Sequence, residues 1–230
     1  MHVRAIAPLA AAVALCLSSV TAVAAEIEPA ELLKQAKAEQ PAYLETVEQL
    51  VAVDTGTGQE KGRATVSQMV GERLQALGAA VSTRRATPSV GDNIVATLQG
   101  KGSKNFLLMI HYDTVFAEGS AAERPFRMDG QRAYGPGVAD AKGGVAMILH
   151  ALKLLRDQQF DDYGTITVLF NPDEEMGSAG SKALIAELAR KHDYVFSYEP
   201  PDRDAGTPAT DGINAAMLEA KGKSAHAGSA

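Results

Sequence analysis

The stretch Gly135-Pro-Gly-Val-Ala-Asp140-Ala-Lys-Gly-Gly144 places one acidic residue between two groups of glycines, and the rest of the chain is organised around it. Glycine and proline before Asp140 predict a tight, irregular turn, and the two glycines after it allow close packing of the backbone. Apolar residues then recur at helical spacing over residues 145–155, which predicts a helix with one buried face. The stretch therefore holds Asp140 on a constrained loop at a helix entrance, where an aspartate either caps the helix or belongs to a functional site.

Helical and strand patterns alternate on both sides of this stretch. The helices are predicted at residues 29–53, with a break at Pro41, and at residues 60–77, 145–155 and 178–190, the last capped by Ser178. The strands are predicted at residues 79–85, 91–100, 105–110, 164–170 and 194–198. The last three are continuous apolar runs, which are typical of strands buried on both faces. The alternation predicts an α/β fold with a mostly parallel central sheet flanked by helices.

The N-terminal residues carry the features of a secretory signal peptide. Arg4 supplies a positive charge, an apolar run of small residues follows, and a small-x-small cleavage site ends it. We expect a signal peptide at residues 1–24, with cleavage after Ala25 as an alternative, and secretion into the periplasm of a bacterium. A membrane anchor is the competing interpretation, which Pro8 within the apolar run disfavours. Cys16, the single cysteine of the chain, lies in this segment, so the mature chain has no disulfide.

Length and charge limit what the mature chain can be. The 230 residues carry a net charge of −6 without a long basic run, which argues against a nucleic-acid partner. No other stretch approaches membrane-spanning length, so we expect no membrane contact after signal cleavage. We expect residues 25–211 to form the N-terminal part of a catalytic domain that ends in a Pro/Gly-rich link. Residues 212–219 have a strand pattern at the start of a second domain over residues 212–230, so the chain looks C-terminally truncated.

Residue types that bind metals follow each buried strand. His111-Tyr-Asp113 follows the first, Asn171-Pro-Asp173-Glu174-Glu175 follows the second, and Glu199 follows the third. In open α/β sheets, ligands bind at the carboxyl ends of the strands. Each cluster has a structural alternative: a packed histidine, an aspartate that ends a strand, a solvated acidic turn, or a surface corner. Their joint occurrence with Asp140 at separate strand ends favours a functional site.

Crowded carboxylates favour metal ions at this site. Four carboxylates close together repel each other, and divalent cations remove that repulsion. Oxygen ligands with imidazole suit zinc, with Co2+ or Mn2+ as substitutes, and Asp140 on its rigid loop is the best bridge between two ions. Asp113 lies on the same side of an extended chain as His111 and could accept its imidazole N–H. Of Glu174 and Glu175, one can bind metal while the other remains free as a general base.

Four motifs together carry a specific family resemblance. They are His-x-Asp-x-Val at 111–115, Gly-Pro-Gly-x-x-Asp-x-Lys-Gly-Gly at 135–144, Asp-Glu-Glu at 173–175 and Glu-Pro at 199–200. In these motifs the chain resembles the co-catalytic zinc carboxypeptidase and aminoacylase family, peptidase family M20, and within it the bacterial glutamate carboxypeptidases. The resemblance covers nearly the whole mature chain. It implies a zinc-peptidase-like domain, here incomplete, and the first strand of an α+β lid or dimerisation domain.

The resemblance also implies a set of metal ligands. His111, Asp140 and Glu199 would hold one zinc, and Asp140 and Glu175 would hold the other, giving two Zn2+ per complete subunit. The peptide link from Asp140 to Ala141 is often cis in the family. The family's last zinc ligand is a histidine that would lie beyond residue 230, so we expect the chain as given to be inactive by itself.

Three further residues receive catalytic roles from the resemblance. Glu174 would be the general base, and Asp113 would orient the zinc-binding imidazole. His226, in the segment that resembles the start of the lid domain, would reach the partner subunit's active site and help to bind the oxyanion. For an isolated histidine, a surface position is the alternative.

These features predict a secreted, zinc-dependent metallopeptidase that hydrolyses the amide bond to a C-terminal amino acid. The resemblance implies glutamate as that amino acid, folate-type compounds, small peptides or N-acyl amino acids as substrates, and a homodimer formed through the lid domain. One alternative is a metal-binding but catalytically incomplete protein that acts only through its dimer surface. Another is a di-metal phosphoesterase, which is disfavoured because only Lys142 accompanies the acidic ligands where phosphate would need a basic cluster.

Overall fold

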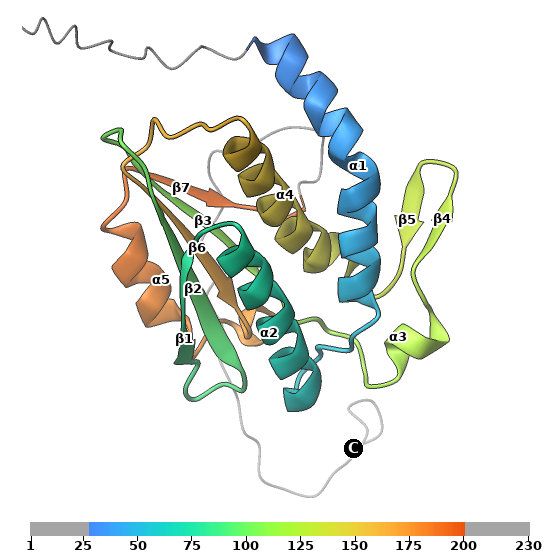
Figure 1. The fold of residues 1–230 in the computed structure, drawn as a ribbon. Coiled ribbons are helices and arrows are strands. Elements are labelled where there is room, and N and C mark those ends of the chain that lie inside the picture. Colours follow the sequence, from blue (N-terminus) through green and yellow to red (C-terminus); the bar gives the residue numbers. More distant parts are fainter. Residues whose placement is uncertain (1–27, 201–230) are drawn as a thin grey trace, which may run out of the picture.

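The computed structural model describes residues 28–200 and shows one sheet with helices on both of its faces (Figure 1). Five strands form the sheet in the order β1-β2-β6-β3-β7. Four of them run in the same direction and β2 runs opposite, because β2 pairs antiparallel with β1 and β6 while β3 pairs parallel with β6 and β7. The predicted α/β fold with a mostly parallel central sheet is therefore confirmed.

The strands and helices have the following bounds. The central strands are β1 (Ala80–Arg85), β2 (Asp92–Gln99), β3 (Asn105–His111), β6 (Thr165–Asn171) and β7 (Tyr194–Ser197), and a separate hairpin contains β4 (Arg127–Asp129) and β5 (Arg132–Tyr134). The α-helices are α1 (Pro29–Val51), α2 (Glu60–Ala76), α3 (Ser120–Glu123), α4 (Gly143–Asp157) and α5 (Lys182–Ala189). Two short turns carry site residues. One is an irregular turn at Val138–Lys142, in which Asp140 and Ala141 depart from helical backbone angles, and the other is a 3-10 turn at Glu174–Met176.

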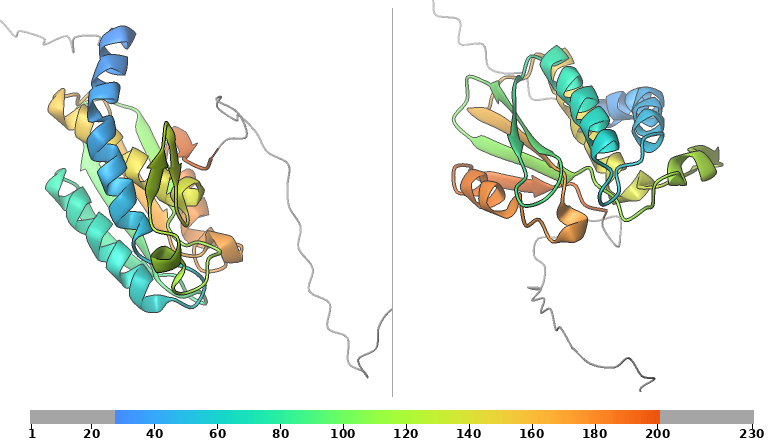
Figure 2. Two further views of the ribbon diagram at one scale, coloured as in Figure 1. Left: turned by 90° about the vertical axis from the view of Figure 1, so that its right-hand side faces the viewer. Right: turned by 90° about the horizontal axis from the view of Figure 1, so that it is seen from below.

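The helices bury both faces of the central strands. Helices α1, α2 and α4 cover one face and α5 covers the other (Figure 2). On β3, Leu108 and Ile110 pack into the core beneath α1, α2 and α4, whereas Leu107 packs on the opposite side with Leu184 and Leu188 of α5. A strand covered on both sides excludes polar side chains from both, which explains why this stretch is a continuous apolar run.

Two predicted helix features are wrong. Pro41 does not break α1, which runs through it because its second half is anchored in the core by Val47, Leu50 and Val51. Ser178 does not cap α5: it has a φ of 54°, and the helix begins only at Lys182. The intervening loop is fastened to the carboxylate of Asp173, which accepts hydrogen bonds from the Gly180 N–H and the Ser181 hydroxyl.

The prediction that the last strand is buried is also wrong. Tyr194, Val195 and Phe196 of β7 are 44–48% exposed. This strand lies at one edge of the described sheet, and α5 packs farther in, against Val95, Leu107 and Leu169. An apolar run thus predicted the strand correctly but could not tell an edge strand from a central one.

Some expectations fall on residues outside 28–200. They are the signal peptide at 1–24, the link at 200–211 except its first residue, the strand at 212–219, the second domain at 212–230, and His226; all of them stay predictions. Within the described part of the chain, no helix combines the length and the apolar character needed to cross a membrane.

The start of α4 approaches the strands closely, and this brings the Asp140 loop to the edge of the sheet. A Cβ atom on Gly144 would lie 2.6 Å from the Tyr198 carbonyl oxygen and 3.0 Å from Cγ1 of Ile110. The residue after Tyr198 is Glu199, so the contact sets how near the helix entrance lies to the end of β7. Only glycine permits this approach without movement of backbone.

We therefore predict that Gly144→Ala destabilises the protein by about 1–3 kcal/mol, because the added methyl group must displace the backbone of Tyr198. Gly71→Ala in α2 is the matched control, since its new Cβ would meet only Cγ1 of Val81 at 3.9 Å. That change should instead stabilise the helix by about 0.5–1 kcal/mol. Urea unfolding followed by circular dichroism measures both. Equal effects of the two substitutions would contradict the close approach.

Candidate metal centre and active site

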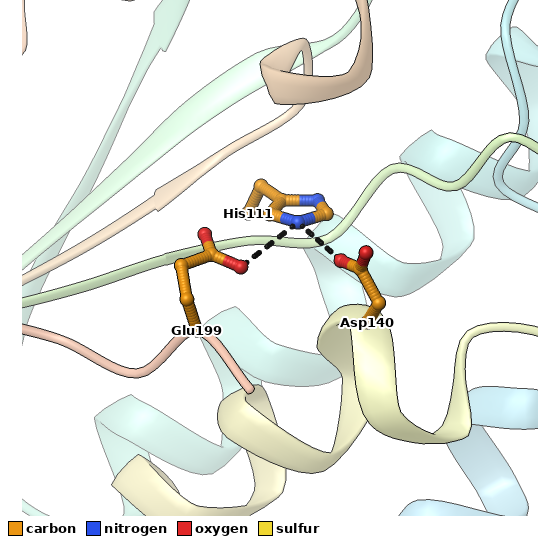
Figure 3. A group of neighbouring side chains, drawn as sticks. All are labelled: His111, Asp140 and Glu199. Carbon is orange, nitrogen blue, oxygen red and sulfur yellow. Dashed lines mark hydrogen bonds and ion pairs between the residues drawn. The ribbon is translucent and has the colours of Figure 1, made fainter. Parts of the chain in front are cut away.

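The ends of three neighbouring strands bring the predicted site residues together. His111 is the last residue of β3, and it is in register with Asn171, the last residue of β6, which the acidic turn follows. Figure 3 shows the His111 imidazole between the carboxylates of Asp140 and Glu199. The Nε2 atom of His111 lies 2.9 Å from Oδ1 of Asp140 and 3.5 Å from Oε2 of Glu199. Glu174 comes next, with its Oε2 atom 3.9 Å from the same nitrogen.

Asp113 is a fully buried carboxylate that fastens the turn after β6 to the end of β3. Its Oδ1 accepts a hydrogen bond from the N–H of Glu174, and its Oδ2 accepts one from the N–H of Glu175, both at 3.1 Å. Nδ1 of His111 lies 3.0 Å from the main-chain oxygen of Asp113 and 3.3 Å from its Oδ1. Asp113 therefore lies behind the imidazole, as expected. Both its main-chain oxygen and its carboxylate face Nδ1 of His111.

The loop around Asp140 is shaped by glycine, and Asp140 does not cap the helix. Gly137 has a φ of 73°, and a Cβ atom on it would lie 2.6 Å from Cγ2 of Thr114. The N–H of Lys142 donates to the Gly137 carbonyl at 2.9 Å, which closes the turn. No side chain caps the start of α4, so the interpretation of Asp140 as a helix cap is wrong. The peptide bond from Asp140 to Ala141 is cis.

The charges of the site shift the pKa values of its members. Burial lowers the pKa of His111, but its hydrogen bonds and proximity to Asp113 and Glu199 outweigh this effect and raise the pKa to about 11. Burial raises the pKa of Glu174 and of Glu175, and the neighbouring carboxylates raise it further while His111 lowers it. The cluster therefore holds more negative charge than its one imidazole compensates, which is the situation that a divalent cation relieves.

The geometry of the cluster fits a zinc ion. Within residues 28–200, ligand atoms of His111, Asp140 and Glu199 lie within 4.8 Å of one another. A tetrahedral zinc with ligands at about 2.1 Å separates its ligand atoms by about 3.4 Å, close to the 2.9 and 3.5 Å measured from Nε2 of His111. One imidazole nitrogen with carboxylate oxygens is a donor set that zinc accepts. Glu175, the expected ligand of a second ion, lies outside this group of three.

Two acidic residues outside the group of three have structural roles. Asp173, from the acidic motif, is buried and accepts hydrogen bonds from the Ser89 hydroxyl at 2.7 Å and from the Gly180 N–H at 2.7 Å. Asp54 accepts hydrogen bonds from the N–H groups of Gly119 and Ala121 at 2.7 and 2.8 Å, and so fixes the start of α3. Such contacts join residues far apart in the sequence, and no local spacing signals them.

Comparison with known proteins identifies the family. The family model described as peptidase family M20/M25/M40 matches residues 107–221, which include the ends of all three site strands. The chain belongs to this family. The family expected from the motifs is thereby confirmed.

The chain matches only part of the length of its relatives. Carboxypeptidase G2 of Pseudomonas sp. (strain RS-16) is 48% identical over 202 residues, which are 86% of this chain and 49% of that protein. Acetylornithine deacetylase of Proteus mirabilis (strain HI4320) is 30% identical over 168 residues, which are 70% of this chain and 43% of that protein. The chain thus spans about half the length of the curated relatives it matches. Human carnosine dipeptidase 1 shares the fold, with a TM-score of 0.64 at 20% identity over 73% of this chain and 40% of its own.

The position of Asp113 leads to a test of its role. We predict that Asp113→Asn weakens zinc binding by about 10- to 100-fold, because the new amide NH2 group would face a backbone N–H that now donates to a carboxylate oxygen. The measurement is competition for zinc against a chromophoric chelator. Asp157→Asn, at an exposed carboxylate in the last turn of α4, is the control and should leave the affinity unchanged. An Asp113 variant with the affinity of the wild type would show that the carboxylate does not hold the site.

Proposed function

We propose that the protein is a zinc-dependent metallo-carboxypeptidase, an amidohydrolase that releases a C-terminal amino acid from small peptides or N-acyl amino acids. The observation that carries this proposal is the convergence of His111, Asp140 and Glu199 on one point, with the carboxylate of Glu174 beside them. Membership of a peptidase family supports the reaction class. A ligand set and a separate base are the parts that hydrolysis of an unreactive amide needs.

We assign His111, Asp140 and Glu199 to one zinc, and Asp140 and Glu175 to a second zinc that needs a further ligand from outside residues 28–200. Charge supports this arrangement, because the pKa of Glu175 is raised by burial and next by the nearby Asp140 carboxylate. When bound, the ions would polarise the substrate carbonyl and lower the pKa of the attacking water. Co2+ or Mn2+ would serve as substitutes, since the same donor set accepts them.

Glu174 is the general base in this proposal. Its side chain is about half exposed, at the mouth of the cluster, and burial of the rest of the carboxyl group raises its pKa toward the range useful for proton transfer. It would take the proton of the attacking water and deliver it to the leaving amine. Asp113 acts behind it, because it fixes the backbone of the Glu174 turn and the ring of His111.

Glutamate is the amino acid that we propose is released. The support is the 48% identity to a protein named carboxypeptidase G2 together with the motif resemblance to glutamate carboxypeptidases. A second relative is named acetylornithine deacetylase, and both names describe cleavage of a bond next to an amino acid. We therefore take hydrolysis of an amide next to an amino acid as the shared reaction, and the identity of that amino acid as the feature that varies.

The remaining features of the proposal rest on residues outside 28–200. We propose export to the periplasm through the signal peptide at 1–24, and a homodimer formed through the lid domain. His226 of that domain would reach the partner subunit's active site and stabilise the oxyanion of the tetrahedral intermediate. The competing proposal is a catalytically incomplete, metal-binding protein that acts only through its dimer surface.

Hydrolysis of paired substrates separates these proposals. The protein as its gene encodes it should release glutamate from an N-acyl glutamate faster than ornithine from N-acetylornithine. A strong chelator should abolish the activity, and added zinc should restore it. Zinc binding without hydrolysis of either substrate would instead support the incomplete, dimer-surface protein.

The two adjacent glutamates should respond differently to loss of charge. We predict that Glu174→Gln keeps the metal content but lowers kcat by about 10²–10⁴, because it removes the proton-transfer group and no metal ligand. Glu175→Gln should lose metal first. Elemental analysis and a hydrolysis assay on the same preparations test this. Loss of zinc from the Glu174 variant would mean that the two roles are exchanged.

A further inference from the structure

Lys142 is a buried cation just behind the candidate metal centre, and the reaction proposed above does not use it. Its side chain is 1% exposed, and its Nζ atom donates a 2.6 Å hydrogen bond to the main-chain oxygen of Val53. Burial lowers its pKa to about 8, and the charge of Asp54 partly offsets this effect. The stem of Lys142 passes close to Gly137, where a Cβ atom would lie 3.3 Å from its Cδ.

The acceptor of this bond belongs to a short segment, residues 53–56, that we call the strap. The strap follows α1 and touches the segment that carries Asp113. The carbonyl oxygen of Thr55 accepts a hydrogen bond from the N–H of Thr114 at 3.3 Å, and Gly56 forms an isolated parallel bridge with Thr114. Buried Arg63 also holds the strap, because it donates hydrogen bonds to the carbonyl oxygens of Thr55 and Gly56 at 3.2 and 2.9 Å.

These contacts close a ring around the site. From Asp140 the chain leads to Lys142, whose ammonium group reaches the strap at Val53. The strap leads to Thr114, one residue after Asp113, and the chain then returns to His111. His111 completes the ring, because its Nε2 atom lies 2.9 Å from Oδ1 of Asp140. The contact between Lys142 and the strap is therefore one link of the ring that joins the two metal-binding side chains.

Stability alone does not account for a lysine at this position. An ammonium group loses its hydration when it is buried, and here its bonded partner is a carbonyl oxygen and not a carboxylate. A methionine of similar length would fill the same space without a buried charge, and it would leave the Val53 carbonyl oxygen without this donor. Buried ionisable side chains with perturbed pKa values cluster at functional sites.

We propose that Lys142 is a positioning residue: through the strap, its ammonium group fixes the Asp140 loop at the distance from His111 that zinc binding requires. The inference rests on the proposed function, because it takes the His111 and Asp140 cluster to be a metal site. It assigns to Lys142 no contact with substrate and no proton transfer. This role would explain why a lysine follows Asp140 by two residues in the motif at 135–144.

The test compares Lys142→Met with the wild type and with Lys153→Met in the protein as its gene encodes it. Lys153 is the control because it lies in α4, the helix that begins directly after Lys142, and because it pairs with Glu39 and Asp157. Zinc affinity is measured by chelator competition, folding by thermal unfolding of the zinc-free protein, and kcat and KM with an N-acyl glutamate. Lys142→Met should fold, bind zinc about 10- to 100-fold more weakly, and lose kcat by a similar factor. Its KM should stay within about twofold of the wild type, because no substrate contact is removed.

Other outcomes would overturn the proposal. Zinc affinity and kcat of Lys142→Met equal to those of Lys153→Met would show that the lysine does not position the site. Lys142→Gln provides a second variant, whose polar head is one bond shorter and carries no charge, and the same losses are expected of it. Failure of both variants to fold would assign Lys142 to the stability of the fold and contradict the inference. A wild-type protein that binds no zinc would refute the proposed function itself, and the inference with it.

Discussion

One buried carboxylate, that of Asp113, links the parts of the site. It has no exposed surface, it accepts hydrogen bonds from the N–H groups of Glu174 and Glu175, and it lies behind the imidazole of His111. A buried carboxylate is costly unless hydrogen bonds satisfy it, so the position of the β6 turn relative to the end of β3 is strongly constrained. Glu174, the proposed base, and the proposed ligands His111 and Glu175 thus take their geometry from one group that substrate would not reach.

The site divides into buried supports and accessible acids. His111, Asp113 and Lys142 are buried, whereas the side chains of Asp140, Glu174 and Glu199 are about half exposed. The buried side chains are held in place by the strand ends and the core, and the exposed carboxylates are accessible to metal ions and substrate from solvent. This arrangement follows from a parallel sheet, in which β3, β6 and β7 end at the same edge.

Sequence patterns predicted the central strands, the long helices and the residues that converge at the sheet edge. They succeeded because burial on two faces produces continuous apolar runs and because the histidine and carboxylate residues follow such runs directly. They failed where distant contacts decide the outcome: Pro41 within α1, the late start of α5, and the exposure of β7. The strap escaped prediction for the same reason, since Lys142 meets it through the backbone oxygen of Val53, which no side-chain pattern encodes.

The central claim is that His111, Asp140 and Glu199 bind one metal ion together. Anomalous diffraction at the zinc absorption edge, from crystals of the zinc-loaded protein, tests it directly. The account predicts an anomalous peak about 2.0–2.2 Å from Nε2 of His111 and from one carboxylate oxygen each of Asp140 and Glu199. A peak bound by other residues, or the absence of a peak at His111 in zinc-saturated crystals, would contradict it.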